Sequence, residues 1–162
     1  MISLTKASHD DAALIHKLQC QSFMPLYERY RDDDTSPAKE PIERIIAKLE
    51  SDNTDFYIIF VDDEPIGAVR VVREGLTDGV EICRISPIFI LPEYQDKGIG
   101  SAVMEMLFER YDVQRWRLST ILQEHRDCHF YEKHGFVRNG ENVNIKDGMT
   151  LVFYEKTVKP DR

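Results

Sequence analysis

Residues 85–108 read ISPIFILPEYQDKGIGSAVMEMLF. The apolar segment that begins at Ile85 predicts a strand, which ends near Pro92 because proline has no backbone N–H to pair. Gly98 and Gly100 then open a predicted helix. The first N–H groups of a helix have no partner within it, and the helix dipole is positive at that end. This segment therefore predicts an anion site at a helix N-terminus, suited to a phosphorylated ligand.

The chain has the composition of one globular domain. Its 162 residues are 42% hydrophobic and 31% charged, and this length usually forms one domain with a full core. The net charge of −8 argues against nucleic acid as the main partner. The apolar runs are too short to span a bilayer, and Cys20, Cys83 and Cys128 follow neither a disulfide nor a zinc spacing. We therefore expect a cytoplasmic protein with reduced thiols, no metal, and no membrane or nucleic-acid partner.

Hydrophobic periodicity and turn residues predict seven strands and four helices. The strands are expected at residues 2–6, 56–61, 66–72, 80–91, 115–122, 136–138 and 149–157, and the helices at about residues 10–23, 42–49, 98–111 and 127–134. Residues 25–41 are expected to form a mobile loop or to contain a helical turn, and residues 74–79 and 139–148 are expected to be turns. The order β-α-α-β-β-β-α-β-α-β-β indicates a mixed α/β (α+β) fold over residues 1–162, with the two strands around the third helix parallel.

Three phosphate-binding motifs consist of a strand, a glycine-containing turn and a helix. A dinucleotide fingerprint needs a third glycine where this chain has Val103. A Walker loop needs Gly-Lys-Ser/Thr at the start of the helix, whereas the order here is Lys97-Gly98-Ile99. The third motif is the pyrophosphate loop of the GNAT superfamily of N-acetyltransferases, which LPEYQDKGIG at residues 91–100 resembles position for position.

A second segment supports this resemblance. Residues 130–136, FYEKHGF, closely resemble the family's Leu/Phe-Tyr-x-x-x-Gly-Phe motif and follow the loop at the interval that the family shows. The predicted order of elements also matches, so the resemblance covers essentially the whole chain. It implies the GNAT fold, a central mixed β-sheet of about seven strands with four helices, and an acetyl-CoA-dependent N-acetyltransferase.

The resemblance also implies how acetyl-CoA binds. The loop backbone would hold the pyrophosphate, and the end of strand 80–91, which separates from the next strand in the family, would pair with the pantetheine arm. Lys97 either adds a charge to the phosphates or is solvated, and the Asp96 carboxylate should face water. Glu124 stands where many members have an asparagine that contacts CoA. The matching positions are Ile88, Phe89, Ile90, Gln95, Asp96, Lys97, Gly98, Ile99, Gly100, Ser101 and Glu124.

For catalysis, the resemblance implies direct attack of a primary amine on the thioester in a ternary complex. Tyr131 matches the tyrosine that, in many members, protonates the departing thiolate, and its alternative role is packing. The general base is less defined: Glu81 is the first candidate, and Glu124 and His125 are others. Arg84 lies among apolar residues in mid-strand, so it should pair with an acid or, less favoured, meet an anionic group of the substrate. His129 and His134 are expected on the surface of the short helix that carries Tyr131.

The sequence leaves the acceptor open between a small-molecule amine and a peptide amine. It should enter between residues 26–40 and 139–147. Tyr27, Tyr30 and the acidic run at residues 32–34 either form a mouth for a cationic amine or belong to a solvated loop. The alternative function is a non-catalytic acyl-CoA-binding or regulatory module on the same fold. A homodimer formed through the final strands is compatible with the sequence.

Overall fold

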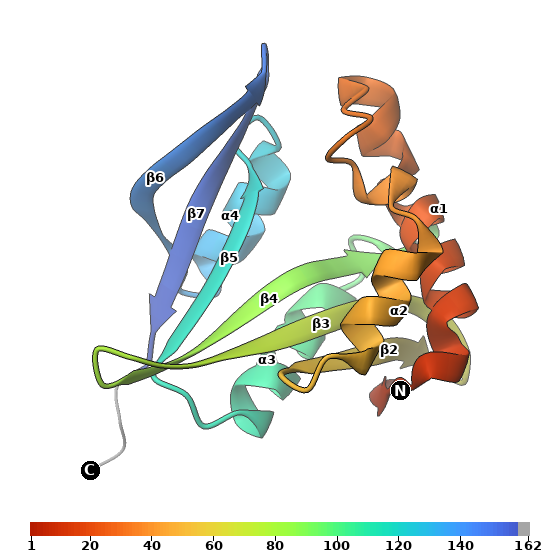
Figure 1. Cartoon of the computed structure of the whole chain (residues 1–162), viewed down its shortest axis with the longest axis horizontal. Coiled ribbons are helices and arrows are strands. Elements are labelled where there is room, and N and C mark those ends of the chain that lie inside the picture. Colours follow the sequence, from red (N-terminus) through yellow and green to blue (C-terminus); the bar gives the residue numbers. More distant parts are fainter. Residues whose placement is uncertain (159–162) are drawn as a thin grey trace.

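The computed structural model describes residues 1–158 and contains one seven-stranded sheet with helices on both faces (Figure 1). The strands are β1 (Ile2–Lys6), β2 (Thr54–Val61), β3 (Glu64–Thr77), β4 (Val80–Ile90), β5 (Arg115–Ile121), β6 (Val137–Lys146) and β7 (Met149–Thr157). The helices are α1 (Ala12–Tyr30), α2 (Ile42–Glu50), α3 (Ile99–Arg110) and α4 (His125–Lys133), with 3-10 turns at His9–Asp11, Pro37–Lys39 and Pro92–Tyr94. The predicted order of helices and strands and the mixed α/β class are confirmed.

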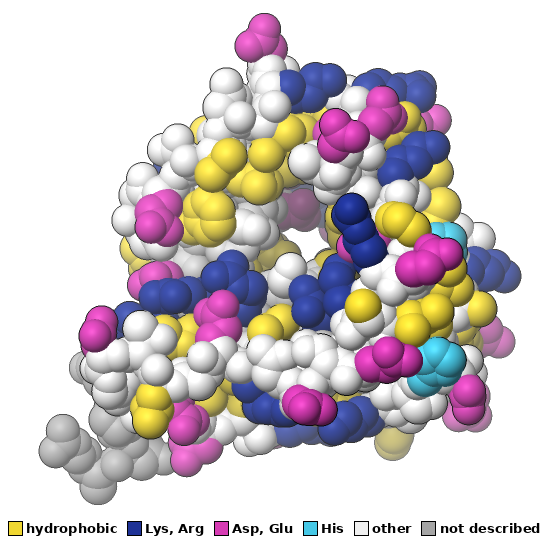
Figure 2. All heavy atoms as spheres, viewed as in Figure 1, with side chains coloured by type: hydrophobic (Ala, Val, Ile, Leu, Met, Phe, Trp, Pro, Cys, Tyr) yellow, Lys and Arg dark blue, Asp and Glu magenta, His cyan; other side chains and the backbone are white. Residues whose placement is uncertain are grey.

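The sheet has the strand order β1-β2-β3-β4-β5-β7-β6. Within the described chain, β4 and β5 are the only parallel neighbours, as predicted for two strands joined through a helix. Their contact is short, because it joins Ile82–Arg84 to Arg115–Arg117 and goes no further. The sheet therefore opens into two halves beyond this contact (Figure 1), and the surface is hollowed between them (Figure 2).

Helices on opposite faces of the sheet bury two separate cores. Helices α1 and α2 pack on one face of β2–β4, and α3 and α4 lie on the other face (Figure 1). Along β4, Ile85 belongs to the core under α3, whereas Phe89 belongs to the core under α1. Two residues four positions apart on a regular strand would share a face. The change of face reflects a bulge opposite Arg70, where the register between β3 and β4 shifts.

Helix α1 continues past Pro25 to Tyr30, and a 3-10 turn follows at Pro37–Lys39. Of the two alternatives for residues 25–41, the structure therefore shows the one that contains helical turns. Proline lacks an N–H and normally ends a helix. Here contacts from outside the helix hold its last turns. The ring of Phe23 packs edge-on against Phe89, with 5.5 Å between centroids, and Glu124 accepts hydrogen bonds from the final turn. The helix ends at Arg31, which has a left-handed φ of 51°.

Two strands extend through segments predicted to be turns. β3 continues to a tight turn at Asp78–Gly79, because Gly75, with φ of 80°, forms a bulge within the hairpin rather than its end. β6 covers residues 137–146, although only residues 136–138 were predicted to be strand. Its side chains are almost all exposed, so no alternating apolar pattern marks it in the sequence.

Asp55 is the centre of a buried polar cluster on β2. Its side chain is 7% exposed, accepts hydrogen bonds from Arg73 and from Tyr111 Oη at 2.6 Å, and lies 3.2 Å from Lys6 Nζ. Tyr57 Oη lies 2.7 Å from Tyr111 Oη and extends the cluster. Burial alone would raise the pKa of Asp55, but the hydrogen bonds from Arg73, Tyr111 and Lys6 outweigh it and hold that pKa below its usual value.

We expect Asp55→Ala to lower the free energy of unfolding at pH 7 by about 2 kcal/mol, because Arg73 and Tyr111 lose their acceptor. Urea denaturation measures this. Asp112→Ala is the control, since Asp112 is exposed and makes no side-chain hydrogen bond or ion pair within residues 1–158, and its effect should stay below about 0.5 kcal/mol. Because the folded-state pKa of Asp55 is lowered, its contribution is fully present above the unfolded-state pKa and is lost as the pH falls through the folded-state pKa. Equal losses in the two variants would contradict this role.

Candidate functional site

The loop between β4 and α3 presents unpaired backbone N–H groups. Gly98 is the N-cap of α3 and has φ of 78°, and no side chain of the described residues caps the helix. Across residues 1–158, the N–H groups of residues 98–101 have no hydrogen-bond partner. A Cβ placed on Gly98 would meet no atom within 4 Å, so the space above the start of the helix is open. The geometry of the predicted anion site is therefore present at this helix start.

Two further residues of this loop pack α3 against α4. A Cβ placed on Gly100 would lie 3.1 Å from Phe130 Cζ, so glycine is needed here for packing as well. Ser101 Oγ lies 3.0 Å from His134 Nε2. The expectation that His134 lies on the surface is wrong, because its side chain is largely buried, and burial together with two neighbouring lysines lowers its pKa.

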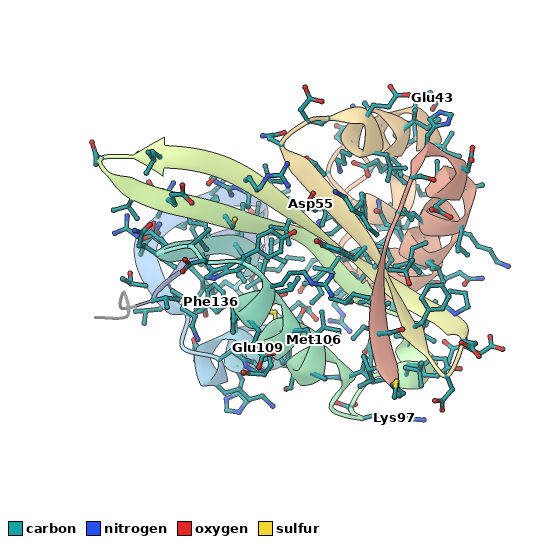
Figure 3. The ribbon with its side chains drawn as sticks, turned by 90° about the horizontal axis from the view of Figure 1, so that it is seen from below. Glu43, Asp55, Lys97, Met106, Glu109 and Phe136 are labelled. Atoms are coloured by element: carbon teal, nitrogen blue, oxygen red, sulfur yellow. The ribbon has the colours of Figure 1, made fainter. Side chains whose placement is uncertain are left out.

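Two side chains of the loop, Gln95 and Asp96, are held by contacts with β4 and α4. Gln95 Nε2 donates to the carbonyl of Ile90 at 3.0 Å and closes the loop onto β4. The Asp96 carboxylate is exposed, and it also lies 2.5 Å from Arg126 Nη2 on α4. Lys97 extends away from the molecule at the edge of the loop (Figure 3). Sequence reasoning missed Arg126, because only the fold brings it to Asp96.

The second half of β4 has one backbone edge that pairs with no other strand of residues 1–158. The N–H of Leu91 donates to the carbonyl of Ile66 at 2.8 Å, so Leu91 and Phe89 direct their backbone groups toward β3. Those of Ile88 and Ile90 consequently point toward β5, which does not pair with this stretch. The Ile90 carbonyl accepts the hydrogen bond from Gln95. The Ile90 N–H and the N–H and carbonyl of Ile88 face the gap between β4 and β5. Of the three predicted backbone contacts, Phe89 directs its backbone groups toward β3, and its side chain lies in the core under α1.

Tyr131 is half-buried on α4 among aromatic side chains. The ring centroids of Phe130, Phe136 and Tyr154 lie between 5.3 and 6.4 Å from its own. Within the described part of the chain, Tyr131 Oη has no hydrogen-bond partner. Burial, and after it the charge of Asp127, raises the pKa of Tyr131. The phenol carries its proton at neutral pH, and the raised pKa makes that proton harder to release than in a free tyrosine.

Glu124 joins α4 to the end of α1. Its carboxylate is 14% exposed and lies 2.5 Å from both Arg29 Nη1 and Tyr30 Oη. Burial alone would raise the pKa of Glu124, but these two hydrogen bonds outweigh it and lower that pKa. A carboxylate with a lowered pKa and two donors is a poor general base. Its predicted contact with CoA stays a prediction.

The predicted base Glu81 lies apart from these residues. It is exposed at the start of β4, opposite Leu76, and its backbone N–H donates to Gln114 Oε1 at 2.8 Å. The paired stretch Ile82–Arg84 separates it from the open half of β4. The structure does not bring Glu81 and Tyr131 together. A catalytic role for Glu81 stays a prediction that this geometry does not support.

The acidic run lies in the turn after α1. Asp33 accepts a hydrogen bond from the buried Tyr27. Asp33 and Asp34 line a pocket of about 360 Å³ that reaches Ser86 and Pro87 in β4. The same pocket is also lined by three cationic side chains, those of Lys39, Arg44 and Lys48. The side chains around this pocket therefore carry both signs of charge, whereas the sequence suggested an acidic mouth.

Metal-binding and membrane-spanning features are not found among residues 1–158. No group of three or more His, Cys, Asp or Glu side chains is placed to hold a metal ion. No helix there combines the length and the apolar character needed to cross a bilayer. The three cysteines are free thiols.

Solved structures share this fold over nearly the whole chain, at identities that show the fold alone. An acetyltransferase from Thermus thermophilus is 20% identical with a TM-score of 0.73, covering 98% of this chain and 97% of that one. The PaiA N-acetyltransferase from Thermoplasma acidophilum, in complex with coenzyme A, is 20% identical (TM-score 0.66; 98% and 99% covered). The spermidine/spermine N-acetyltransferase SpeG from Vibrio cholerae is 16% identical (TM-score 0.67; 97% and 95% covered).

The sequence itself also matches a family. No protein of curated function has significant sequence similarity to the chain. The family model described as an acetyltransferase (GNAT) domain matches residues 52–138. That range includes both the glycine loop before α3 and the segment FYEKHGF. The chain belongs to the GNAT acetyltransferase family.

Proposed function

We propose that the protein is an N-acetyltransferase that moves the acetyl group of acetyl-CoA to a primary amine by direct attack in a ternary complex. The observation that carries this proposal is the combination of unpaired N–H groups at residues 98–101 with the free edge of β4. Helix-start N–H groups suit a pyrophosphate, and a free strand edge suits an extended chain with amide groups. Coenzyme A carries both on one molecule, and the PaiA structure contains coenzyme A.

The loop backbone from Asp96 to Ser101 would hold the pyrophosphate. Gly98 leaves the space above the helix start open to it. The Asp96 carboxylate would repel phosphate, but its ion pair with Arg126 neutralises that charge. Lys97 is exposed, so its ammonium group is available to the phosphates.

The acetyl transfer needs a stabilised thioester oxygen and a proton for the leaving thiolate. The N–H groups of Ile88 and Ile90 face the gap, where one of them would donate to that oxygen as negative charge develops. Tyr131 would give its phenol proton to the leaving sulfur, since its hydroxyl has no other partner in the described chain. Positioning of the two reactants would supply much of the rate. Glu81 stays the predicted base for the amine proton, although the paired stretch Ile82–Arg84 separates it from the gap.

The second candidate is a non-catalytic acyl-CoA-binding module on the same fold. The unpartnered hydroxyl of Tyr131, within the described chain, favours the enzyme over this module. CoA release from acetyl-CoA, measured with a panel of amines that includes polyamines and amino sugars, separates the two. CoA binding without turnover above hydrolysis would support the module. The free thiols fit a cytoplasmic setting, and a homodimer stays a prediction.

We expect Gly98→Glu to weaken CoA binding by about 30-fold, which corresponds to about 2 kcal/mol of lost hydrogen bonds to phosphate. The new carboxylate would occupy the open space above the helix start and repel the pyrophosphate. Calorimetric titration measures the affinity. Gly140→Glu is the matched control, because Gly140 also has a positive φ, of 93°, and open space around it. Unchanged affinity in Gly98→Glu would contradict the proposed pyrophosphate site.

We expect Tyr131→Phe to lower kcat about 100-fold while CoA affinity stays within about twofold, because the variant loses only the proton donor. Steady-state turnover and calorimetry measure the two quantities. Tyr154→Phe serves as the control, since the Tyr154 hydroxyl already donates to Glu132 at 2.7 Å. Undiminished turnover in Tyr131→Phe would remove this residue from the proposed mechanism.

A further inference from the structure

A row of charged side chains crosses the sheet face that carries α1 and α2, beyond the part that these helices cover. Arg84 in β4 and Arg117 in β5 are partners in the parallel contact. Glu74 lies 3.1 Å from Arg84 Nε and 4.0 Å from Arg117 Nη1. Glu155 lies 3.2 Å from Arg117 and 3.9 Å from Arg115. The predicted pairing of Arg84 with an acid is confirmed, and the acid is Glu74.

Arg70 adds another positive charge beside this row. It is half-buried in β3 and donates its Nε–H to the carbonyl of Ser86. Burial lowers the pKa of Arg70; Glu40 opposes this lowering and Arg84 adds to it. Within residues 1–158, the Nη atoms of Arg70 and Arg84 have no hydrogen-bond partner. Two neighbouring guanidinium groups therefore keep donors for a further acceptor.

The acids of this region do not balance its arginines. Glu40, the acid near Arg70, is already 2.9 Å from Lys48. The remaining cluster has four arginines against two glutamates, a surplus of two positive charges in a chain of net charge −8. Figure 2 shows Lys and Arg side chains gathered across the middle of this face, below the hollow. A half-buried surplus of one sign is unfavourable unless an anion completes it.

This cluster lies where β4 separates from β5. Arg84 is the last residue of β4 that pairs with β5. Val69 pairs with Ile88 and Val71 with Ile85, so Arg70 lies opposite Ser86–Pro87. The pocket of about 360 Å³ reaches the same two residues. Since a strand advances about 3.3 Å per residue, a group held by Arg70 lies within a few residues of the Ile88 backbone.

We propose that Arg70 and Arg84 bind an acidic group of the acceptor, so that the acceptor is a small amine that also carries a carboxylate or a phosphate. The proposal rests on the proposed acetyl transfer at the gap beside β4. Guanidinium groups whose Nη atoms have no partner among the described residues suit both anions, because they donate two hydrogen bonds in one plane. The alternative of a purely cationic amine, raised by the acidic run, is less favoured, since Asp33 already accepts from Tyr27 and the pocket carries three cationic side chains.

Matched acceptors separate the acidic group from the rest of the substrate. Turnover of acetyl-CoA is compared for amino acids and their carboxamides, for phosphoethanolamine and ethanolamine, and for spermidine. We expect kcat/KM to be at least about tenfold higher for the acid-bearing member of a reactive pair. The pair with the larger ratio of kcat/KM, acid-bearing over neutral, shows whether the site prefers a carboxylate or a phosphate. Preference for the amides, ethanolamine or spermidine would overturn the inference while leaving the acetyltransferase activity established.

Arginine variants test whether these two side chains carry the preference. Arg70→Gln and Arg84→Gln should each raise KM for the acid-bearing amine at least about tenfold, with no change for its neutral counterpart or in CoA affinity. Arg115→Gln is the matched control, because it removes a charge from the same row farther from Ser86, and it should change neither KM. If a variant raised KM equally for both amines, or if Arg115→Gln raised KM as much as the other two, the arginines would only stabilise the sheet. Either result would overturn the inference.

A binding measurement makes the test independent of turnover. Inorganic phosphate is titrated into protein saturated with CoA, which fills the loop before α3. Wild type should bind phosphate at least about tenfold more tightly than the double variant Arg70→Gln/Arg84→Gln. Equal binding would overturn the anion site. If CoA binds and no amine is acetylated, the proposed catalysis fails, and the phosphate titration still decides the anion site.

Discussion

The short parallel contact between β4 and β5 is the constraint on which the rest of the structure depends. The two strands pair over Ile82–Arg84 of β4 and no further. At Ser86–Pro87 the strand bulges opposite Arg70, and its side chains change faces. Beyond this point β4 keeps β3 on one side and leaves its other edge free, which creates both the gap and the hollow above it.

Contacts between helices fix the loop and the free strand edge relative to each other. Phe130 of α4 fills the space beside Gly100 of α3, and Gln95 ties the loop to the end of β4. Glu124 holds the last turn of α1 from the opposite side of the gap. A ligand with a pyrophosphate and an amide chain therefore meets two preformed surfaces, and preformed surfaces reduce the entropy lost on binding. The charged row around Arg84 lies at the closed end of the same gap.

The sequence predicted the elements that carry local signals, such as the glycine turn at Gly98 and the apolar strand that leads into it. It left residues 25–41 open between a loop and a helical turn, because Glu124, 95 residues from its partner Arg29, helps to hold the last turn of α1. It missed most of β6, whose exposed side chains carry no pattern. The resemblance suggested Glu81 as a base. The sequence does not show which end of β4 stays paired with β5, and Glu81 lies at the paired end, away from the gap. The charge surplus likewise depends on which strands are neighbours.

Amide hydrogen exchange with and without coenzyme A tests most directly whether the gap beside β4 binds the donor. If the free edge pairs with the pantetheine arm, the N–H groups of Ile88 and Ile90 will exchange at least about tenfold more slowly in the complex, as will those of residues 98–101. The N–H groups of Ile82–Arg84, in the stretch already paired with β5, will not change. Protection confined to residues 98–101, with unchanged exchange at Ile88 and Ile90, would contradict the central claim.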